Sequence, residues 1–230
     1  MARAKAAVQA AQKPCWIRFM AAVVPNTVSP LFQSIDKAIA SGADHIHLML
    51  SSPGGSVFHG LSVHNYLRGL AIPVTTYNFG SVDSIGVVIF CSGKERVSVP
   101  HARFLIHSVT WNATGQISLD EKGLEEHLKS VKIDAENIAR VIADTSTRNL
   151  AQMEKDMLDR TTLNPTQAKD YGLVTKVQKD LYTGGVLYAI YENGQVFQSS
   201  QGVEQLAHST STQMNVSSPT AQRNTTLSNF

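Results

Sequence analysis

The pattern of apolar and polar residues along the chain predicts an α/β protein. Residues 45–50 form a short, mostly apolar run bounded by polar residues, which is typical of a strand covered on both faces in a parallel sheet. Apolar residues then recur at helical spacing over residues 61–70, and Pro73 ends the pattern. A second strand-like run follows at residues 74–79. This order predicts a parallel crossover, whose turn lies at the carboxyl edge of the sheet, where α/β proteins usually bind ligands.

Two glycine-bearing turns are expected at this edge. The first comprises residues 52–55, Ser-Pro-Gly-Gly, and the second comprises residues 80–86, with Ser84 between a strand and a short apolar helix. Glycine has no Cβ atom, so the backbone N–H groups of the first turn can approach a substrate closely. A serine at the mouth of the second strand offers a nucleophile. The two turns therefore suggest half of a serine-peptidase active site.

A third segment supplies a candidate base. Residues 97–107 contain two short apolar strands, and the second delivers His107 at its end. A neutral imidazole is the usual base for a serine hydroxyl, because it changes its charge near operating pH. The sequence therefore predicts that Ser84 and His107 meet at one edge of the sheet.

Together, the three segments resemble the Clp protease proteolytic subunit family and its relatives of the ClpP/crotonase fold. That family has an S-P-G-G turn, a G-x-x-x-S-x-G nucleophile segment and a P-x-x-R-x-x-I-H base segment. In this chain they are residues 52–55, 80–86 and 100–107, and the resemblance runs from about Trp16 to about Val177. It implies an α/β fold built from repeated β-β-α units, with a mostly parallel sheet and a protruding handle helix.

The resemblance also implies roles for individual residues. Ser84 becomes the nucleophile and His107 the general base, and the N–H groups of Gly55 and Ile85 form the oxyanion hole. Gly54 and Thr110, which lies in the segment after His107, are expected to bind substrate. The implied reaction is hydrolysis of peptide bonds, in peptides or unfolded proteins, through an acyl-enzyme.

The third member of a catalytic triad is ambiguous in this sequence. The family places an aspartate shortly before a segment A-x-x-Y-G-L-V, here residues 168–174, and counting back from that segment reaches Arg160. Asp159 is adjacent and is our prediction, whereas Asp156 is the alternative and Asp83 a poor third candidate. If none of them orients His107, a dyad or a slower enzyme results.

Each candidate residue also has a structural interpretation. A serine before a helix is ordinarily an N-cap, and a Pro-Gly-Gly sequence can be a simple tight turn. His107 can be a hydrogen-bonded histidine at a strand end, and Asp159 a solvated surface charge. The combination of three motifs favours the catalytic interpretation for Ser84 and His107, while Asp159 remains balanced between the two.

Composition argues against several other classes of protein. The chain has 230 residues, a net charge of +2 and no long basic run, which disfavours nucleic-acid binding. We expect no metal and no cofactor, because His45 and His47 lack a third ligand nearby and no phosphate-binding loop occurs. Any ATPase must therefore be a separate chain. Apolar stretches are too short to span a membrane, and there is no secretion signal. Two cysteines, without a disulfide framework, favour a cytoplasmic setting.

Other segments bear on assembly. Apolar residues step by three or four over residues 124–141, which predicts an amphipathic helix. The resemblance makes it the handle helix through which rings stack in a homo-oligomer; packing on its own domain is the alternative. Use of a separate AAA+ ATPase is left open, because only a short basic stretch precedes Trp16. The glycine-rich substrate-binding run of the family is reduced to one glycine, Gly115.

The chain is predicted to have four parts. They are a flexible N-terminal segment, a peptidase domain, a hairpin around the turn Asn193-Gly194 and a flexible polar tail, at residues 1–15, 16–178, 179–198 and 199–230. Two alternatives to a serine peptidase are compatible with the sequence. One is a crotonase-type acyl-CoA enzyme, and the other is a non-catalytic ring subunit.

Overall fold

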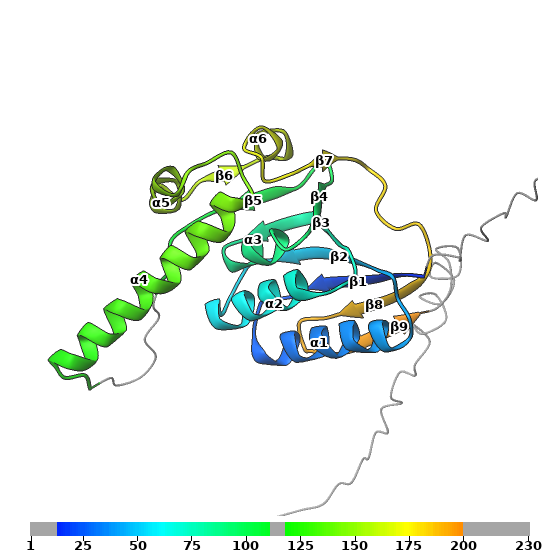
Figure 1. Ribbon diagram of the computed structural model, residues 1–230, viewed down its shortest axis with the longest axis horizontal. Helices are drawn as coiled ribbons and strands as arrows, with labels where there is room; N and C mark the ends of the chain where they lie inside the picture. The colour runs from blue at the N-terminus through cyan, green and yellow to red at the C-terminus, as the bar shows by residue number, and fades with distance from the viewer. Residues whose placement is uncertain (1–12, 111–117, 200–230) are drawn as a thin grey trace, which may run out of the picture.

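The computed structural model describes residues 13–110 and 118–199. The strands in these ranges form one mixed sheet (Figure 1). The strand order is β6-β5-β3-β2-β1-β8-β9, and β4 pairs with β3 and β7. Pairing is parallel except between β5 and β6 and between β8 and β9. The strands are β1 Pro14–Met20, β2 His45–Ser52, β3 Val74–Asp83, β4 Glu95–Ser98, β5 Arg103–Leu105, β6 Thr162–Leu163, β7 Lys176–Val177, β8 Val186–Ile190 and β9 Val196–Ser199.

Side chains of alternate strand residues face two different cores. Ile17, Leu48 and Leu50 point to the main core, which also takes the apolar faces of α1, α2 and α3. Trp16, Met49 and other residues on the opposite sheet face form a smaller cluster. This is the period of two expected for strands, and it confirms the predicted α/β class with a mostly parallel sheet. The helices are α1 Pro25–Ala40, α2 Val57–Gly69, α3 Ile85–Phe90, α4 Glu121–Asp144, α5 Leu150–Leu158 and α6 Pro165–Asp170.

Strand β3 is longer than the sequence pattern predicts. The apolar run predicts a strand that ends at residue 79, but the strand continues without interruption to Asp83 and so reaches Ser84 directly. Its first half pairs with β4 and its second half with β5, and its register against β2 shifts between Leu50 and Ser52. Gly80 accommodates this shift, because a Cβ atom there would lie 2.9 Å from the hydroxyl of Ser51.

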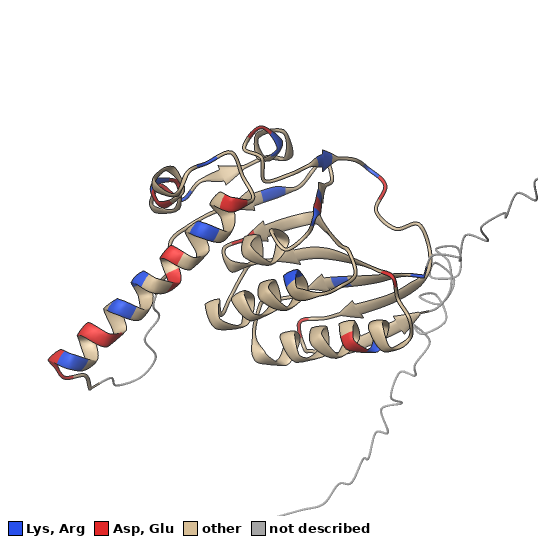
Figure 2. Cartoon of the chain, viewed as in Figure 1, with Lys and Arg blue, Asp and Glu red and all other residues tan. Residues whose placement is uncertain are grey.

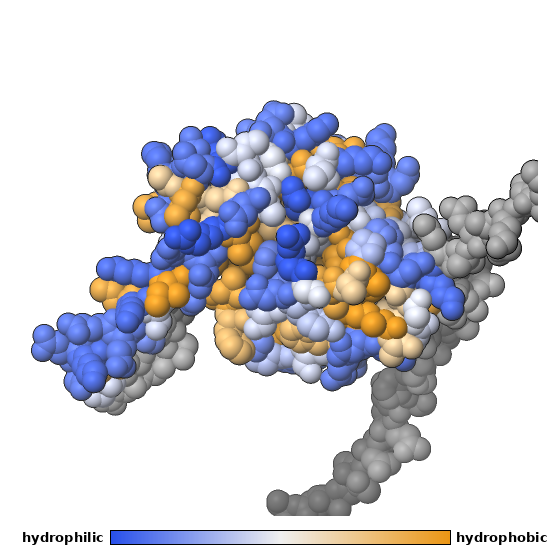
Figure 3. Space-filling model, in the orientation of Figure 1, coloured by the Kyte–Doolittle hydropathy of each residue, from blue (hydrophilic) through white to orange (hydrophobic). Residues whose placement is uncertain are grey.

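Helix α4 projects from the body of the protein (Figure 1). It spans 24 residues, Glu121–Asp144, and is longer than the predicted 124–141. Asp120 is its N-cap and accepts a hydrogen bond from the N–H of Gly123. Lys, Arg, Asp and Glu are interspersed along it (Figure 2), and apolar side chains gather in its middle part (Figure 3). Only its C-terminal part is buried, through Ile138, Ala139 and Ile142. The N-terminal part leaves Leu124 and Leu128 more than half exposed.

The C-terminal hairpin is continuous with the main sheet. Strand β8 pairs in parallel with β1, and β9 pairs antiparallel with β8 around the turn that contains Gly194. Gly194 has φ 77°, and a Cβ atom there would lie 2.3 Å from the carbonyl oxygen of Asn26. The proposed boundary between residues 178 and 179 is therefore not a break in the sheet. None of the described helices has the length and apolar character to cross a membrane.

Candidate active site

Ser84 occupies a sharp turn between β3 and α3. Its backbone angles are φ 56° and ψ −129°, a region that only glycine enters without strain. The N–H of Ser84 donates to the carbonyl of Leu105 at 2.8 Å, which ties the turn to β5. Its side chain makes no capping hydrogen bond to α3, so the ordinary N-cap explanation does not account for this serine. A strained turn that presents a hydroxyl between a strand and a helix is the geometry of a nucleophile elbow.

The glycine turn packs directly against Ser84. Gly54 and Gly55 have φ values of 92° and 147°. A Cβ atom on Gly54 would lie 2.6 Å from the Cβ of Ser84, and one on Gly55 would lie 2.4 Å from the carbonyl oxygen of Val23. Val23 pins the turn on both sides, because its N–H donates to Gly54 and its carbonyl accepts from Ser56, each at 2.8 Å. These bonds do not use the N–H of Gly55.

Helix α3 holds Ile85, the residue after Ser84, in a rigid position. All six residues of α3 are buried. Its first turn touches α2 so closely that a Cβ atom on Gly60 would lie 2.2 Å from Cγ1 of Ile85. Ile85 is the first residue of the helix, where backbone N–H groups have no partner within the helix.

His107 lies two residues beyond the end of β5 and is partly buried. Its Nδ1 is 2.7 Å from the carbonyl oxygen of Ser108. A carbonyl oxygen only accepts hydrogen bonds, so Nδ1 carries a proton, and in the neutral imidazole Nε2 is then the acceptor. This is the tautomer that a general base requires.

The two side chains share one cavity of about 210 Å³, although no hydrogen bond joins them. The cavity brings together most of the predicted site, namely Gly55, Ser84, Ile85, His107 and Thr110. Gly54 lies directly behind Ser84. Sequence reasoning missed the apolar walls, which are Val57, Val109 and Ile138. The helical spacing over residues 124–141 was the available signal for Ile138, and Val57 adjoins the glycine turn.

The candidate aspartates have other partners. Asp159 is exposed and pairs with Lys155 one helical turn earlier. Asp156 accepts from the hydroxyl of Tyr171 at 2.6 Å and pairs with Arg148 at 3.3 Å. Within residues 13–110 and 118–199, no hydrogen bond or ion pair joins either carboxylate to His107.

The remaining acidic candidate is likewise engaged. Asp83 is paired with Arg103 at 2.7 Å and accepts from the hydroxyl of Ser81 at 2.9 Å. The triad role of Asp159 stays a prediction.

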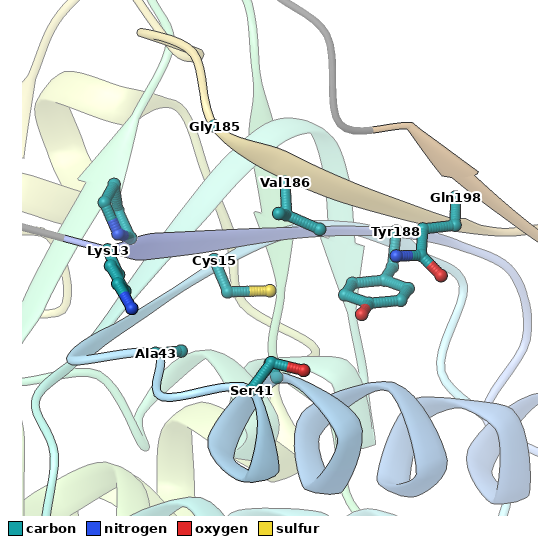
Figure 4. A pocket seen from close by; sticks show the side chains of 10 residues that line it. Lys13, Cys15, Ser41, Ala43, Gly185, Val186, Tyr188 and Gln198 are labelled. Carbon is teal, nitrogen blue, oxygen red and sulfur yellow. The ribbon is translucent and has the colours of Figure 1, made fainter.

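Other reactive side chains lie away from this cavity. Cys15 lines a separate cavity of about 260 Å³ with Tyr188 and Gln198 (Figure 4), and burial raises the pKa of its thiol to about 12. His47 stacks on Trp16 and bonds Tyr77, and burial lowers its pKa to about 4. No group of three His, Cys, Asp or Glu side chains in the described part of the chain is arranged to hold a metal ion. Packing and local hydrogen bonds therefore account for these residues.

Comparison with known proteins decides the family. The family model named Clp protease matches residues 31–180. The chain belongs to the Clp protease family. A curated relative, the ATP-dependent Clp protease proteolytic subunit of Bdellovibrio bacteriovorus, is 30% identical over 134 residues, which is 57% of this chain and 63% of that relative. The match thus spans slightly less than two thirds of the relative's length.

A solved structure shows the same fold. A ClpP1 mutant from Listeria monocytogenes superposes with a TM-score of 0.65, covering 72% of this chain and 91% of its own, at 22% identity. The handle helix and mostly parallel sheet expected from the Clp protease resemblance are thus features of the observed fold. Residues 111–117, which include Gly115, lie outside the described residues.

Proposed function

We propose that this chain is a serine endopeptidase that cleaves peptides or unfolded proteins. One observation carries the proposal: Ser84, on its strained turn, and His107, whose neutral imidazole accepts at Nε2, line the same cavity. Strain of this kind costs about 1–3 kcal/mol and persists where the surrounding structure imposes it, usually at functional sites. Membership of the Clp protease family supports the same assignment.

The reaction follows from the chemistry of these groups. Nε2 of His107 takes the proton of the Ser84 hydroxyl, while Oγ attacks the carbonyl carbon of the scissile peptide. The carbonyl oxygen becomes an oxyanion, which accepts from the N–H groups of Gly55 and Ile85. His107 returns the proton to the leaving amine, and the C–N bond breaks. Water then hydrolyses the ester on Ser84, with the same imidazole acting as base.

The cavity also indicates how substrate binds. Its walls at Val57, Val109 and Ile138 are aliphatic, so the residue before the scissile bond is apolar and of moderate size. An extended substrate pairs with the backbone that leads from His107 to Thr110.

Assembly is proposed on separate grounds. The projecting part of α4 exposes Leu124, Leu128 and Ile133, an apolar surface suited to a second copy of the chain. The chain forms homo-oligomeric rings that stack through these helices, in a cytoplasmic setting. An AAA+ ATPase, where one is used, is a separate protein.

Peptide hydrolysis tests this function. The purified protein should cleave a fluorogenic peptide with an apolar residue before the scissile bond, and Ser84→Ala and His107→Ala should each lower kcat by about 10³-fold or more. His101→Ala is the matched control, because His101 is exposed in the loop before β5. Absence of hydrolysis, with Ser84→Ala unchanged in every assay, would indicate a non-catalytic ring subunit. Acyl-CoA turnover that survives Ser84→Ala would indicate a crotonase-type enzyme.

A further inference from the structure

The pairing of β5 with β6, followed beyond the ends of the two strands, leads from His107 to Arg160. Phe104 is paired with Leu163 and Leu105 with Thr162, in antiparallel register. The next pair in this register is joined by a hydrogen bond of 2.8 Å from the N–H of Ile106 to the carbonyl of Thr161. Continued one step beyond that bond, the same register leads from His107 to Arg160, which lies in the turn after α5. We infer that a cationic residue occupies the chain position where a histidine-orienting carboxylate would be needed.

The backbone at Arg160 is set by the surrounding fold. Arg160 follows α5 and has φ 55°, and Ser84 is the other non-glycine residue with positive φ in the described part of the chain. Its N–H donates to Met157 at 3.3 Å, and the N–H of the following Thr161 donates to Asp156 at 3.2 Å. Asparagine and aspartate enter this left-handed conformation more readily than arginine does. Replacing Arg160 by either residue should therefore preserve the scaffold.

The group that orients His107 is a main-chain carbonyl. Nδ1 is bound to the carbonyl of Ser108, while Asp156 is engaged by Tyr171 and Arg148 and Asp159 by Lys155. The Ser108 carbonyl is itself placed by the fold, because the N–H of Ser108 donates to Met157 at 3.0 Å. Among the residues that the structure describes, a main-chain carbonyl therefore holds the imidazole in its working tautomer.

We propose that the hydrolytic unit is a Ser84–His107 dyad, in which the main-chain carbonyl of Ser108 positions the histidine and Arg160 fills the place of an acidic third member. This inference rests on the proposed function. A neutral carbonyl fixes the tautomer but stabilises the imidazolium of the transition state less than a carboxylate does, and a guanidinium at residue 160 supplies no compensating negative charge. Acylation is consequently slow compared with a complete triad.

The test compares substitutions at one position. Arg160→Asp introduces a carboxylate opposite His107, and Arg160→Asn is its uncharged control of the same shape. Arg160→Asp should raise kcat by about tenfold or more over Arg160→Asn, with KM little changed, because it acts on the transition state. Asp159→Asn decides between the dyad and the triad predicted from the sequence: kcat should stay within about threefold of the starting protein if the unit is a dyad. Equal activity of the two Arg160 variants, or a loss of about 100-fold in Asp159→Asn, would overturn the proposal.

A spectroscopic readout separates this inference from the function itself. Nitrogen-15 NMR of the His107 imidazole should show a proton on Nδ1, and the Nδ1–H resonance should be unchanged in Asp159→Asn and move downfield in Arg160→Asp. A shift in Asp159→Asn would instead identify Asp159 as the positioning residue. These spectra require no turnover, so absence of peptidase activity in every variant would refute the proposed function while the tautomer and its partner are still decided.

Discussion

Gly54 and Ser84 are in backbone-to-side-chain contact, so close that a Cβ atom on Gly54 would lie 2.6 Å from the Cβ of Ser84. This contact links the two turns of the site: the nucleophile can stand at the end of β3 only because its neighbour has no side chain. The same contact explains why a Pro-Gly-Gly sequence precedes α2. The glycines therefore allow neighbouring segments to approach closely, in addition to forming the turn.

Gly54→Ala should therefore damage both stability and activity. The new methyl group meets Ser84 and the carbonyl of Asp83, at a φ of 92° that alanine resists, so we expect a loss of about 1–3 kcal/mol in the free energy of unfolding. Gly69→Ala is the matched control, because nothing lies within 4 Å of its Cβ position at the end of α2. Denaturant unfolding measures both variants. Equal effects at the two positions would contradict the contact.

Ser84→Gly should stabilise the protein while abolishing hydrolysis. Glycine adopts the φ of 56° without the strain that serine bears. We therefore expect the free energy of unfolding to rise by about 1 kcal/mol. Ser84→Ala keeps the strain and should lose activity without this gain. Thermal unfolding of the two variants distinguishes them. A glycine variant less stable than the alanine variant would show that the turn is not strained.

Much of this site was accessible from the sequence. The turn motifs, the candidate nucleophile and the candidate base could be read as local patterns, because each depends on neighbours along the chain. The full length of β3 could not, because residues 81–83 are held in the strand by pairing with β5, which lies twenty residues later. Periodicity carries no information on such a pairing.

The environment of His107 was also hidden in the sequence. The carbonyl of Ser108 is a main-chain group, and any residue would supply it. Counting back from the segment at residues 168–174 reaches Arg160, and the antiparallel register of β5 and β6, continued two residues beyond the last strand pair, leads from His107 to the same residue. The choice of Asp159 supposes a one-residue shift where α5 joins the following loop, and it stays a prediction.

Stability should fall as the pH is lowered below about 6.5. Burial lowers the pKa of His47 to about 4, and burial also lowers the pKa values of His45 and His64. The unfolded chain therefore binds more protons than the native state in this range, so stability is fully present above the unfolded pKa and is lost as the pH falls toward 4.

Thermal unfolding from pH 7.5 to pH 4.5 measures this dependence. His47→Gln can still bond Tyr77 but cannot titrate, so it should flatten the profile, whereas the exposed His101→Gln should not. A profile unchanged by His47→Gln would exclude this histidine as a major source of the acid sensitivity.

The projecting part of α4 should control self-association. Leu124→Asp with Leu128→Glu places charges on an exposed apolar surface, so the assembly should dissociate while the melting temperature of the subunit changes by only a few degrees. Glu125→Gln, on the same helix, serves as the control. Light scattering after size exclusion measures the mass. An unaltered oligomer in the double variant would place the interface elsewhere.

The central claim is that His107 activates the hydroxyl of Ser84, and labelling by a fluorophosphonate tests it most directly. Intact-mass spectrometry should show a single phosphonyl adduct on the unmodified protein, its location on Ser84 established by peptide mapping. The adduct should vanish in Ser84→Ala and form at least about 100-fold more slowly in His107→Ala, while His101→Ala reacts normally. An adduct on another residue, or a labelling rate indifferent to His107, would contradict the account.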